Sequence, residues 1–168
     1  MNYRYFLSIL SVTLCITFAS FGKDRASKHT TVKGDLVSIT YGQPSMKGRT
    51  IFGELVPYGE VWRTGADEAT EITFSSDCIF AGKQCKAGTY TLFTIPGKNK
   101  WDVILNAELK QWGAFNYDKI KNKNVLDVQL DITPLSNAVE TFTIDVAKEN
   151  ITMKWEKTSI VIPVKSLR

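Results

Sequence analysis

The sequence predicts an all-β fold, an antiparallel β-sandwich of jelly-roll-like type with about nine short strands and little or no helix. Apolar and polar residues alternate along most of the chain, and this period of two fits a half-buried strand rather than a helix. The clearest example is residues 125–132, in which every second residue from Leu126 to Ile132 is apolar. Turn-forming pairs such as Ala81-Gly82 and Pro96-Gly97 separate the strands.

Seven further segments share this alternation. No segment of the chain after residue 22 has a convincing amphipathic helical pattern over ten residues or more. Residues 106–112 could form one or two helical turns at most. Short antiparallel strands with one apolar face each are buried by stacking two sheets, which favours the sandwich. The segments are Val37/Ile39/Tyr41, Ile72/Phe74, Tyr90/Leu92, Trp101/Val103/Leu105, Phe142/Ile144/Val146, Ile151/Met153/Trp155 and Ile160/Ile162/Val164.

Residues 1–22 have the three-part pattern of a cleavable signal peptide. One basic residue, Arg4, precedes an apolar and hydroxyl run over residues 6–18, and small residues follow. Cleavage after Ala19 and cleavage after Gly22 both fit. The run is shorter than the ~20 residues of a membrane-spanning helix, and no later stretch approaches that length. We therefore expect a periplasmic or secreted protein without a membrane span.

The remaining chain has the size of a single domain that can bury its own core. We expect residues 23–31 to be a polar, loosely held N-terminal lead and residues 32–168 to form one β-sandwich domain. Removing the signal peptide with its single Arg4 lowers the formal charge from +4 to +3. Lysines and acids are interspersed, which does not suggest binding to nucleic acid.

Two cysteines follow the signal peptide, Cys78 and Cys85. A two-residue turn at Ala81-Gly82 would place them opposite each other on two antiparallel strands. An oxidising compartment would then permit a disulfide, although this rung is the hydrogen-bonded type, whose wider spacing suits a disulfide less well. The alternative is a pair of buried free thiols.

Residues 42–65 interrupt the alternation with five of the eleven glycines and two of the five prolines. They also carry large apolar residues, including Phe52 and Trp62. Glycine-rich backbone with so much apolar side chain indicates an ordered loop packed on a core. Ordered loops on a β scaffold often carry function.

The only histidine is His29, in the predicted lead. This excludes a Ser-His-acid triad, a His-paired cysteine and a multi-histidine zinc site from the predicted domain. No phosphate-binding loop, dinucleotide fingerprint or haem-attachment motif occurs, so we expect no cofactor.

Arginine usage gives the strongest positive signal. After residue 22 the chain has 16 lysines and four arginines, and only Arg49 and Arg63 lie away from the ends. A planar guanidinium suits carboxylate recognition or stacking on an aromatic face. One interpretation is that Arg63 pairs with Asp67, Glu68 or Glu71 to fasten its own loop. The other is an anion or sugar site, whose candidate residues on this loop are Arg49, Trp62, Arg63, Asp67 and Glu68.

A second cluster, residues 111–118, contains Trp112, Asn116, Tyr117 and Asp118, which are residue types that stack on sugars or hydrogen-bond to them. Aromatic residues of β proteins also serve in packing. A glycosidase could pair Asp67 or Glu68 with Asp118. In an extended segment Asp67 and Glu68 would point to opposite faces and could not form a working pair themselves.

Six motifs follow one another along the chain, namely Tyr41-Gly-Gln-Pro-Ser, Gly48-Arg-Thr-Ile-Phe-Gly53, Val56-Pro-Tyr-Gly59, Val61-Trp-Arg-Thr-Gly-Ala-Asp-Glu-Ala-Thr70, Ala87-Gly-Thr-Tyr-Thr-Leu-Phe-Thr-Ile-Pro-Gly97 and Trp112-Gly-Ala-Phe-Asn-Tyr-Asp118. Together they resemble the domain-of-unknown-function 2911 family, from about residue 31 to residue 164. The resemblance implies an exported protein of Bacteroidetes-type bacteria and brings no established catalytic residues. The family usually has Gly-Ala-Asn-Glu where this chain has Gly65-Ala-Asp-Glu68, and aliphatic residues at the Cys78 and Cys85 positions, which implies that both cysteines lie on a buried face.

The sequence thus favours a non-catalytic binding module for a small polar or anionic ligand such as a glycan. Two alternatives remain open. One is a cell-envelope module that binds a partner protein, and the other is a carboxylate-based glycoside hydrolase or lyase.

Overall fold

The computed structural model of the protein describes residues 25–167. The predicted signal peptide, residues 1–22, and its two cleavage positions lie outside the described residues.

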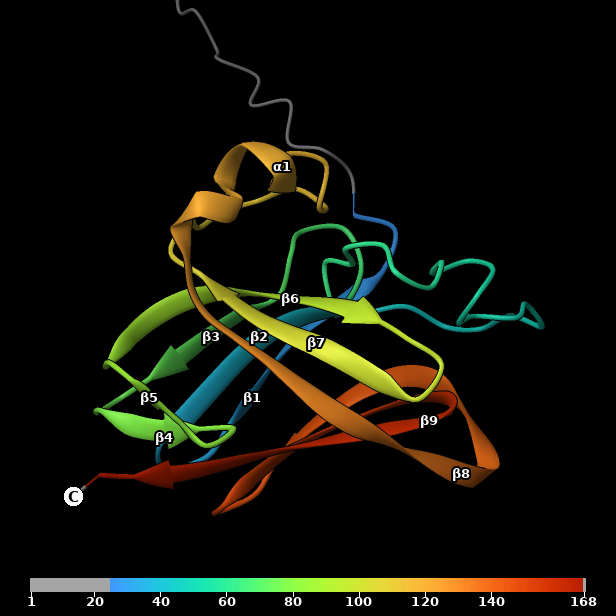
Figure 1. Ribbon diagram of the computed structural model, residues 1–168. Helices are drawn as coiled ribbons and strands as arrows, with labels where there is room; N and C mark the ends of the chain where they lie inside the picture. Colours follow the sequence, from blue (N-terminus) through green and yellow to red (C-terminus); the bar gives the residue numbers. More distant parts are fainter. Residues whose placement is uncertain (1–24, 168) are drawn as a thin grey trace, which may run out of the picture.

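The described chain forms nine antiparallel strands and one short helix, which confirms the predicted all-β class (Figure 1). The strands pair edge to edge in the order β1-β2-β3-β6-β7-β8-β9-β4-β5. Their bounds are β1 Lys28–Lys33, β2 Val37–Gln43, β3 Glu71–Phe74, β4 Cys78–Phe80, β5 Lys83–Cys85, β6 Gly88–Pro96, β7 Lys100–Asn106, β8 Asn124–Val146 and β9 Asn150–Ser166.

Strand β8 carries the sheet from one layer of the sandwich into the other. Its first part, up to Asp131, pairs with β7. Its second part, from Ile132 onward, pairs with β9. Figure 1 shows β8 and β9 crossing beneath the layer formed by β1, β2, β3, β6 and β7. The apolar faces of both layers enclose one core, which includes Ile39 of β2 and Ile144 of β8.

The sequence suggested separate short strands at 125–132 and 142–146, whereas the structure joins them into one long strand. Two register shifts interrupt the pairing of β8 with β9, between Pro134 and Val139 and between Val139 and Thr143. On β9, Glu156 opposite Val139 has a positive φ of 51°. Bulges bend a strand and increase its twist, so these shifts curve the part of β8 that pairs with β9.

The β4–β5 hairpin has the predicted register. Cys78 pairs with Cys85, and Phe80 pairs with Lys83. Ala81 and Gly82 between them both have positive φ, 49° and 82°, as the tight hairpin turn requires. The hairpin joins the second layer because β4 also pairs with the end of β9.

The predicted loose lead at residues 23–31 is wrong for its described part. Residues 28–33 form strand β1, which pairs along its whole length with β2. The burial pattern of β1 has no buried residue, so it presents no apolar alternation in the sequence. Main-chain hydrogen bonds to β2 stabilise this edge strand instead.

Helical structure lies later in the chain than residues 106–112. The helix α1 spans Tyr117–Ile120 and a 3₁₀ turn follows at Lys121–Lys123. Figure 1 shows α1 above one end of β6 and β7. Within residues 25–167, no helix has the length and apolar character that crossing a bilayer requires.

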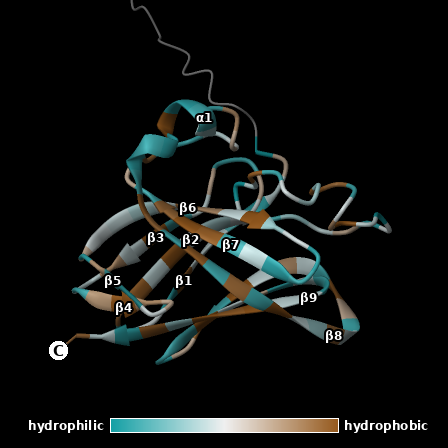
Figure 2. Ribbon diagram, viewed as in Figure 1, coloured by the Kyte–Doolittle hydropathy of each residue, from teal (hydrophilic) through white to brown (hydrophobic). Residues whose placement is uncertain are grey.

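An aromatic cluster lies where the two layers meet. Trp62 stacks on Trp155 of β9, with ring centroids 5.7 Å apart and ring planes 19° apart. Phe142 of β8 and Trp101 of β7 approach Trp62 at 5.0 and 6.1 Å. Figure 2 shows hydrophobic and hydrophilic bands alternating along the strands that carry such residues. The cluster therefore joins the two layers to each other and to the loop that carries Trp62.

We expect Phe142→Ala to lower the free energy of unfolding by about 3–5 kcal/mol, because it leaves a cavity between Tyr41, Trp62 and Trp155. Urea unfolding measures the loss. Val125→Ala on the same strand removes a side chain that is 53% exposed and should cost less than about 0.5 kcal/mol. Equal losses for the two variants would contradict the central place of Phe142.

Candidate functional site

The glycine-rich segment 42–65 is an ordered loop, as the sequence indicated. Phe52 and Trp62 insert their rings into the aromatic cluster, with centroids 6.0 Å apart. The Glu156 carboxylate of β9 accepts hydrogen bonds from the main-chain N–H groups of Ile51 and Phe52, both at 3.2 Å. The loop is thus fixed by apolar side chains and by a charged acceptor on the second layer.

A pocket of about 590 Å³ opens between this loop, the N-terminal segment and the loop before α1. Such a volume lies within the range of small-molecule sites. Its apolar lining includes Leu55, Val56, Pro57, Trp62, Phe115 and Trp155. Its charged lining consists of Lys47, Arg49, Glu60, Arg63 and Asp67.

Arg49 is held at the pocket by its own loop. Its Nε donates to the carbonyl of Met46 at 2.9 Å, and its Nη2 donates to the carbonyl of Ser45 at 2.7 Å. These bonds use two of the five guanidinium N–H groups. Among residues 25–167 no carboxylate forms an ion pair with Arg49.

Arg63 likewise contacts a main-chain oxygen and not a carboxylate. Its Nη1 donates to the carbonyl of Asp67 at 3.4 Å. The ion pair with Asp67, Glu68 or Glu71 that one interpretation of the sequence required does not form within the described part of the chain. Arg63 therefore fastens its loop only weakly and keeps most of its donors.

Asp67 and Glu68 fasten the N-terminal segment to the pocket. The Asp67 carboxylate accepts hydrogen bonds from the main-chain N–H groups of Ala26 at 3.1 Å and Ser27 at 2.9 Å. Glu68 pairs with Arg25, whose Nη2 lies 2.6 Å from Oε1. Ala26 and Ser27 consequently form one wall of the pocket, whereas Glu68 does not line it.

The expectation that Asp67 and Glu68 point to opposite faces is wrong. His29 Nε2 lies 3.6 Å from Asp67 Oδ2 and 3.1 Å from Glu68 Oε2, so both carboxylates face one imidazole. The reason is the positive φ of Asp67, 64°, which removes the alternation of an extended segment. Within residues 25–167, no group of three or more His, Cys, Asp or Glu side chains could hold a metal ion.

His29 reaches the two carboxylates because Gly42 has no side chain. His29 pairs with Gly42 across β1 and β2. A Cβ on Gly42 would lie 2.9 Å from His29 Nε2 and 2.3 Å from the carbonyl oxygen of Ala66. Sequence reasoning missed His29 because it assigned the residue to the lead, and the only local signal was the glycine that lies opposite it.

Three residues in or beside the pocket lining have a strained backbone. Lys47, Thr64 and Asp67 have positive φ values of 49°, 55° and 64°. Such conformations are costly for residues with a Cβ, above all for a β-branched threonine, and they often occur at functional sites. Thr64 is buried and its hydroxyl lies 3.1 Å from that of Thr94.

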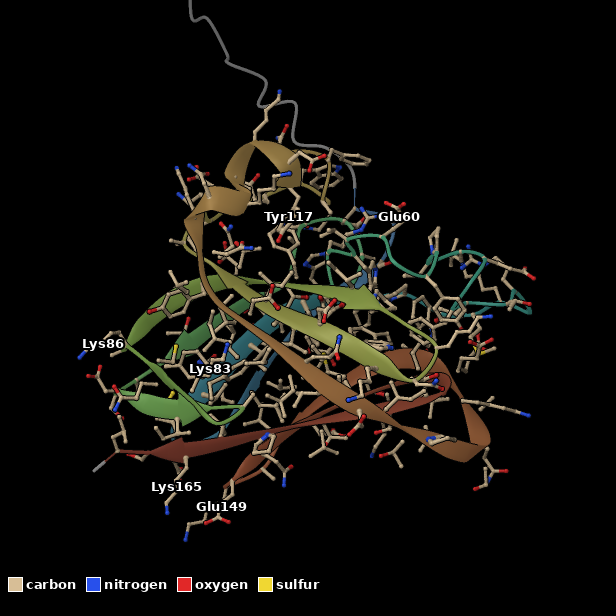
Figure 3. The ribbon with its side chains drawn as sticks, viewed as in Figure 1. Glu60, Lys83, Lys86, Tyr117, Glu149 and Lys165 are labelled. Atoms are coloured by element: carbon tan, nitrogen blue, oxygen red, sulfur yellow. The ribbon has the colours of Figure 1, made fainter. Side chains whose placement is uncertain are left out.

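The second predicted cluster contributes less than expected. Asn116 precedes α1 and is exposed, and Asp118 pairs with Lys121 on the surface at 3.2 Å. Tyr117, the first residue of α1 (Figure 3), packs on Phe93 and accepts a hydrogen bond from Asn124. Trp112 forms a β-bridge with Glu68. None of these four predicted residues lines the pocket.

Ala114 and Phe115 are the members of this loop that reach the pocket. Phe115 is 80% exposed. Sequence reasoning missed it because the search for sugar-binding types selected Trp112 and the polar residues around it. Lys47 and Glu60 were also missed, since nothing local distinguishes them from other surface charges. Figure 3 shows Glu60 on the side of the molecule where the 42–65 loop lies.

The two cysteines are both free in the structure and both buried. Burial raises the pKa of the Cys78 thiol to about 12, with the neighbouring Cys85 adding to the effect. A thiol so seldom ionised is a poor nucleophile. Neither cysteine lines the pocket, so this pair belongs to the core of the β4–β5 hairpin.

A family model described as a protein of unknown function (DUF2911) matches residues 23–164. No curated protein and no solved structure matches the chain.

The Arg25–Glu68 pair makes a testable contribution to stability. Its hydrogen bond lowers the pKa of Glu68 below the ordinary 4.5. A lowered folded-state pKa stabilises the protein above the ordinary value, and this contribution is lost as the pH falls through the folded-state pKa. Glu68→Gln should therefore destabilise the protein at pH 7 by less than about 1 kcal/mol, because the pair is partly exposed.

Unfolding free energies of both proteins between pH 7 and pH 2 measure this effect. The difference between wild type and Glu68→Gln should shrink below pH 4.5 and vanish at the acid end. Glu54→Gln changes an exposed carboxylate outside the pocket lining and provides the matched control. A difference that stays constant over the whole range would show that the ion pair does not stabilise the fold.

Proposed function

The chain belongs to the DUF2911 family, whose function is unknown, and we propose that it is a binding protein for an anionic ligand held in the pocket beside Arg49 and Arg63. The observation that carries this proposal is the pair of guanidinium groups. Both line one pocket, and within residues 25–167 neither forms an ion pair.

The local charge of the pocket supports an anion. Lys47, Arg49 and Arg63 supply three positive charges, and Glu60 and Asp67 supply two negative ones. The Asp67 carboxylate already accepts two main-chain hydrogen bonds, so part of its negative charge is satisfied internally. The cationic side chains keep unused donors, which a carboxylate or phosphate could accept in pairs.

The protein also preorganises the arginine side chains of the site. Carbonyl oxygens of its own loop hold the Arg49 guanidinium. The residue before Arg63, Trp62, is buried in the aromatic cluster and donates its indole N–H to Gly65 at 3.1 Å. A fixed guanidinium loses less conformational entropy on binding than a free one, which favours affinity.

Binding fits the pocket better than carboxylate-based hydrolysis. A glycosidase needs two carboxyl groups that flank one bond. Asp118 is exposed on α1 and does not line the pocket, and Glu68 is held by Arg25 outside it. Asp67 lines the pocket, but main-chain N–H groups hold its carboxylate.

We place this activity outside the cytoplasm. The support is the pattern of residues 1–22, with one basic residue followed by an apolar run and small residues. N-terminal sequencing of the protein from its native host tests the assignment. A new N-terminus at residue 20 or 23 would support it, and a cytoplasmic chain that begins at Met1 would contradict it.

Arg63→Lys keeps the charge and removes the planar fork. We expect it to weaken binding of a carboxylate or phosphate probe about tenfold, since a charge-assisted hydrogen bond contributes about 1.5–3 kcal/mol. Isothermal titration with phosphate, citrate and glucuronate measures the change. Lys121→Met removes a cation of the 3₁₀ turn after α1 that pairs with Asp118, and it should leave affinity unchanged.

Two results would contradict the proposal. If no probe binds the wild-type protein, the pocket is not an anion site for these groups. If Arg63→Lys binds a probe as tightly as wild type, Arg63 does not contact the anion. Thermal unfolding of each variant establishes that the fold is retained.

A further inference from the structure

Phe115 presents a nearly free aromatic ring at the pocket. Its side chain is among the exposed large hydrophobic groups, at 80%, and it lines the pocket. Gly113 positions the ring, because its φ is 69° and a Cβ there would lie 2.7 and 2.9 Å from two ring carbons. The ring therefore lies against the backbone of Gly113, where a side chain would collide with it.

Arg63 lies beside the same glycine. A Cβ on Gly113 would lie 3.3 Å from Arg63 Nη1, so the aromatic ring and the guanidinium flank one residue. A ligand that contacts both at once must combine an apolar face with an adjacent anionic group. Free phosphate and other small inorganic anions have no such face.

Glu60 restricts the charge of the ligand. It lines the pocket, is exposed, and no hydrogen bond or ion pair engages its side chain within residues 25–167. Its carboxylate would repel an anionic group placed beside it and would accept hydrogen bonds from hydroxyl groups. Ser27 of the N-terminal segment also lines the pocket and carries a further hydroxyl group.

We propose that the pocket binds a sugar acid, a pyranose ring that carries one carboxylate. The apolar face of the ring lies on Phe115, the carboxylate contacts Arg63 and Arg49, and ring hydroxyls donate to Glu60. Stacking on an aromatic ring and a planar fork for a carboxylate are the interactions that this chemistry requires. The volume of about 590 Å³ accommodates one or two such rings. This inference rests on the anion-binding function proposed above.

Isothermal titration of the full mature chain tests the inference. The probes are glucuronate and galacturonate, their neutral parents glucose and galactose, and the polyanion citrate. Both sugar acids should bind at least about tenfold more tightly than their neutral parents, because the neutral sugars lack the carboxylate that would form charge-assisted hydrogen bonds with the guanidinium groups. Trigalacturonate in a separate titration distinguishes the source. Tighter binding than the monomer indicates a polysaccharide, and equal binding indicates a free sugar acid.

Two variants separate the contributions of the Phe115 ring and the Glu60 carboxylate to binding. Phe115→Ala should weaken sugar-acid binding roughly fivefold and leave any citrate binding unchanged. Glu60→Gln should weaken sugar-acid binding and strengthen citrate binding, since it removes both an acceptor and a repulsive charge. Val125→Ala, an exposed apolar residue outside the pocket, is the matched control for Phe115→Ala and should change neither affinity.

The outcomes distinguish this inference from the function on which it rests. If citrate binds in an Arg63-dependent way and the sugar acids bind no more tightly than the neutral sugars, the sugar-acid assignment is wrong and anion binding stands. Equal effects of Phe115→Ala on citrate and on sugar acids would also overturn it. If none of the anions binds, both proposals fail.

Discussion

The stack of Trp62 on Trp155 is the contact on which the rest of this structure depends. Trp155 belongs to β9 in the second layer, and Trp62 belongs to the glycine-rich loop. Trp62 also approaches Trp101 of β7 and Phe142 of β8, so one side chain joins both layers to the loop. Large aromatic rings contribute most to the stability of such a core because they bury the most apolar area.

This contact also explains why the pocket lies at the junction of the loop and the sandwich. Trp62 is buried, and the next residue, Arg63, lies at the pocket. The segment that follows then adopts left-handed backbone at Thr64 and Asp67, which brings the Asp67 carboxylate to the main chain of Ala26 and Ser27. Core packing thus supplies the rigidity that holds cationic donors and a strained backbone around the same cavity.

The sequence predicts those parts of the structure that local rules determine. The register of Cys78 and Cys85 follows from a two-residue turn. The rarity of arginine in a lysine-rich chain singles out Arg49 and Arg63, which both line the pocket. Strand β1 was not predicted because an edge strand without buried residues needs no apolar alternation. The convergence of Asp67 and Glu68 on His29 was not predicted because a single positive φ, invisible in the sequence, reverses the direction of one side chain.

An NMR titration of isotope-labelled protein with galacturonate is the most direct test that this pocket is the functional site. Specific binding predicts saturable shifts of the Arg63 guanidinium Nε–H, the Trp62 indole N–H and the Phe115 amide. The β4–β5 hairpin, whose residues do not line the pocket, should be unaffected. Shifts that gather on the hairpin, or no shifts at saturating galacturonate, would contradict the assignment of this pocket as the site.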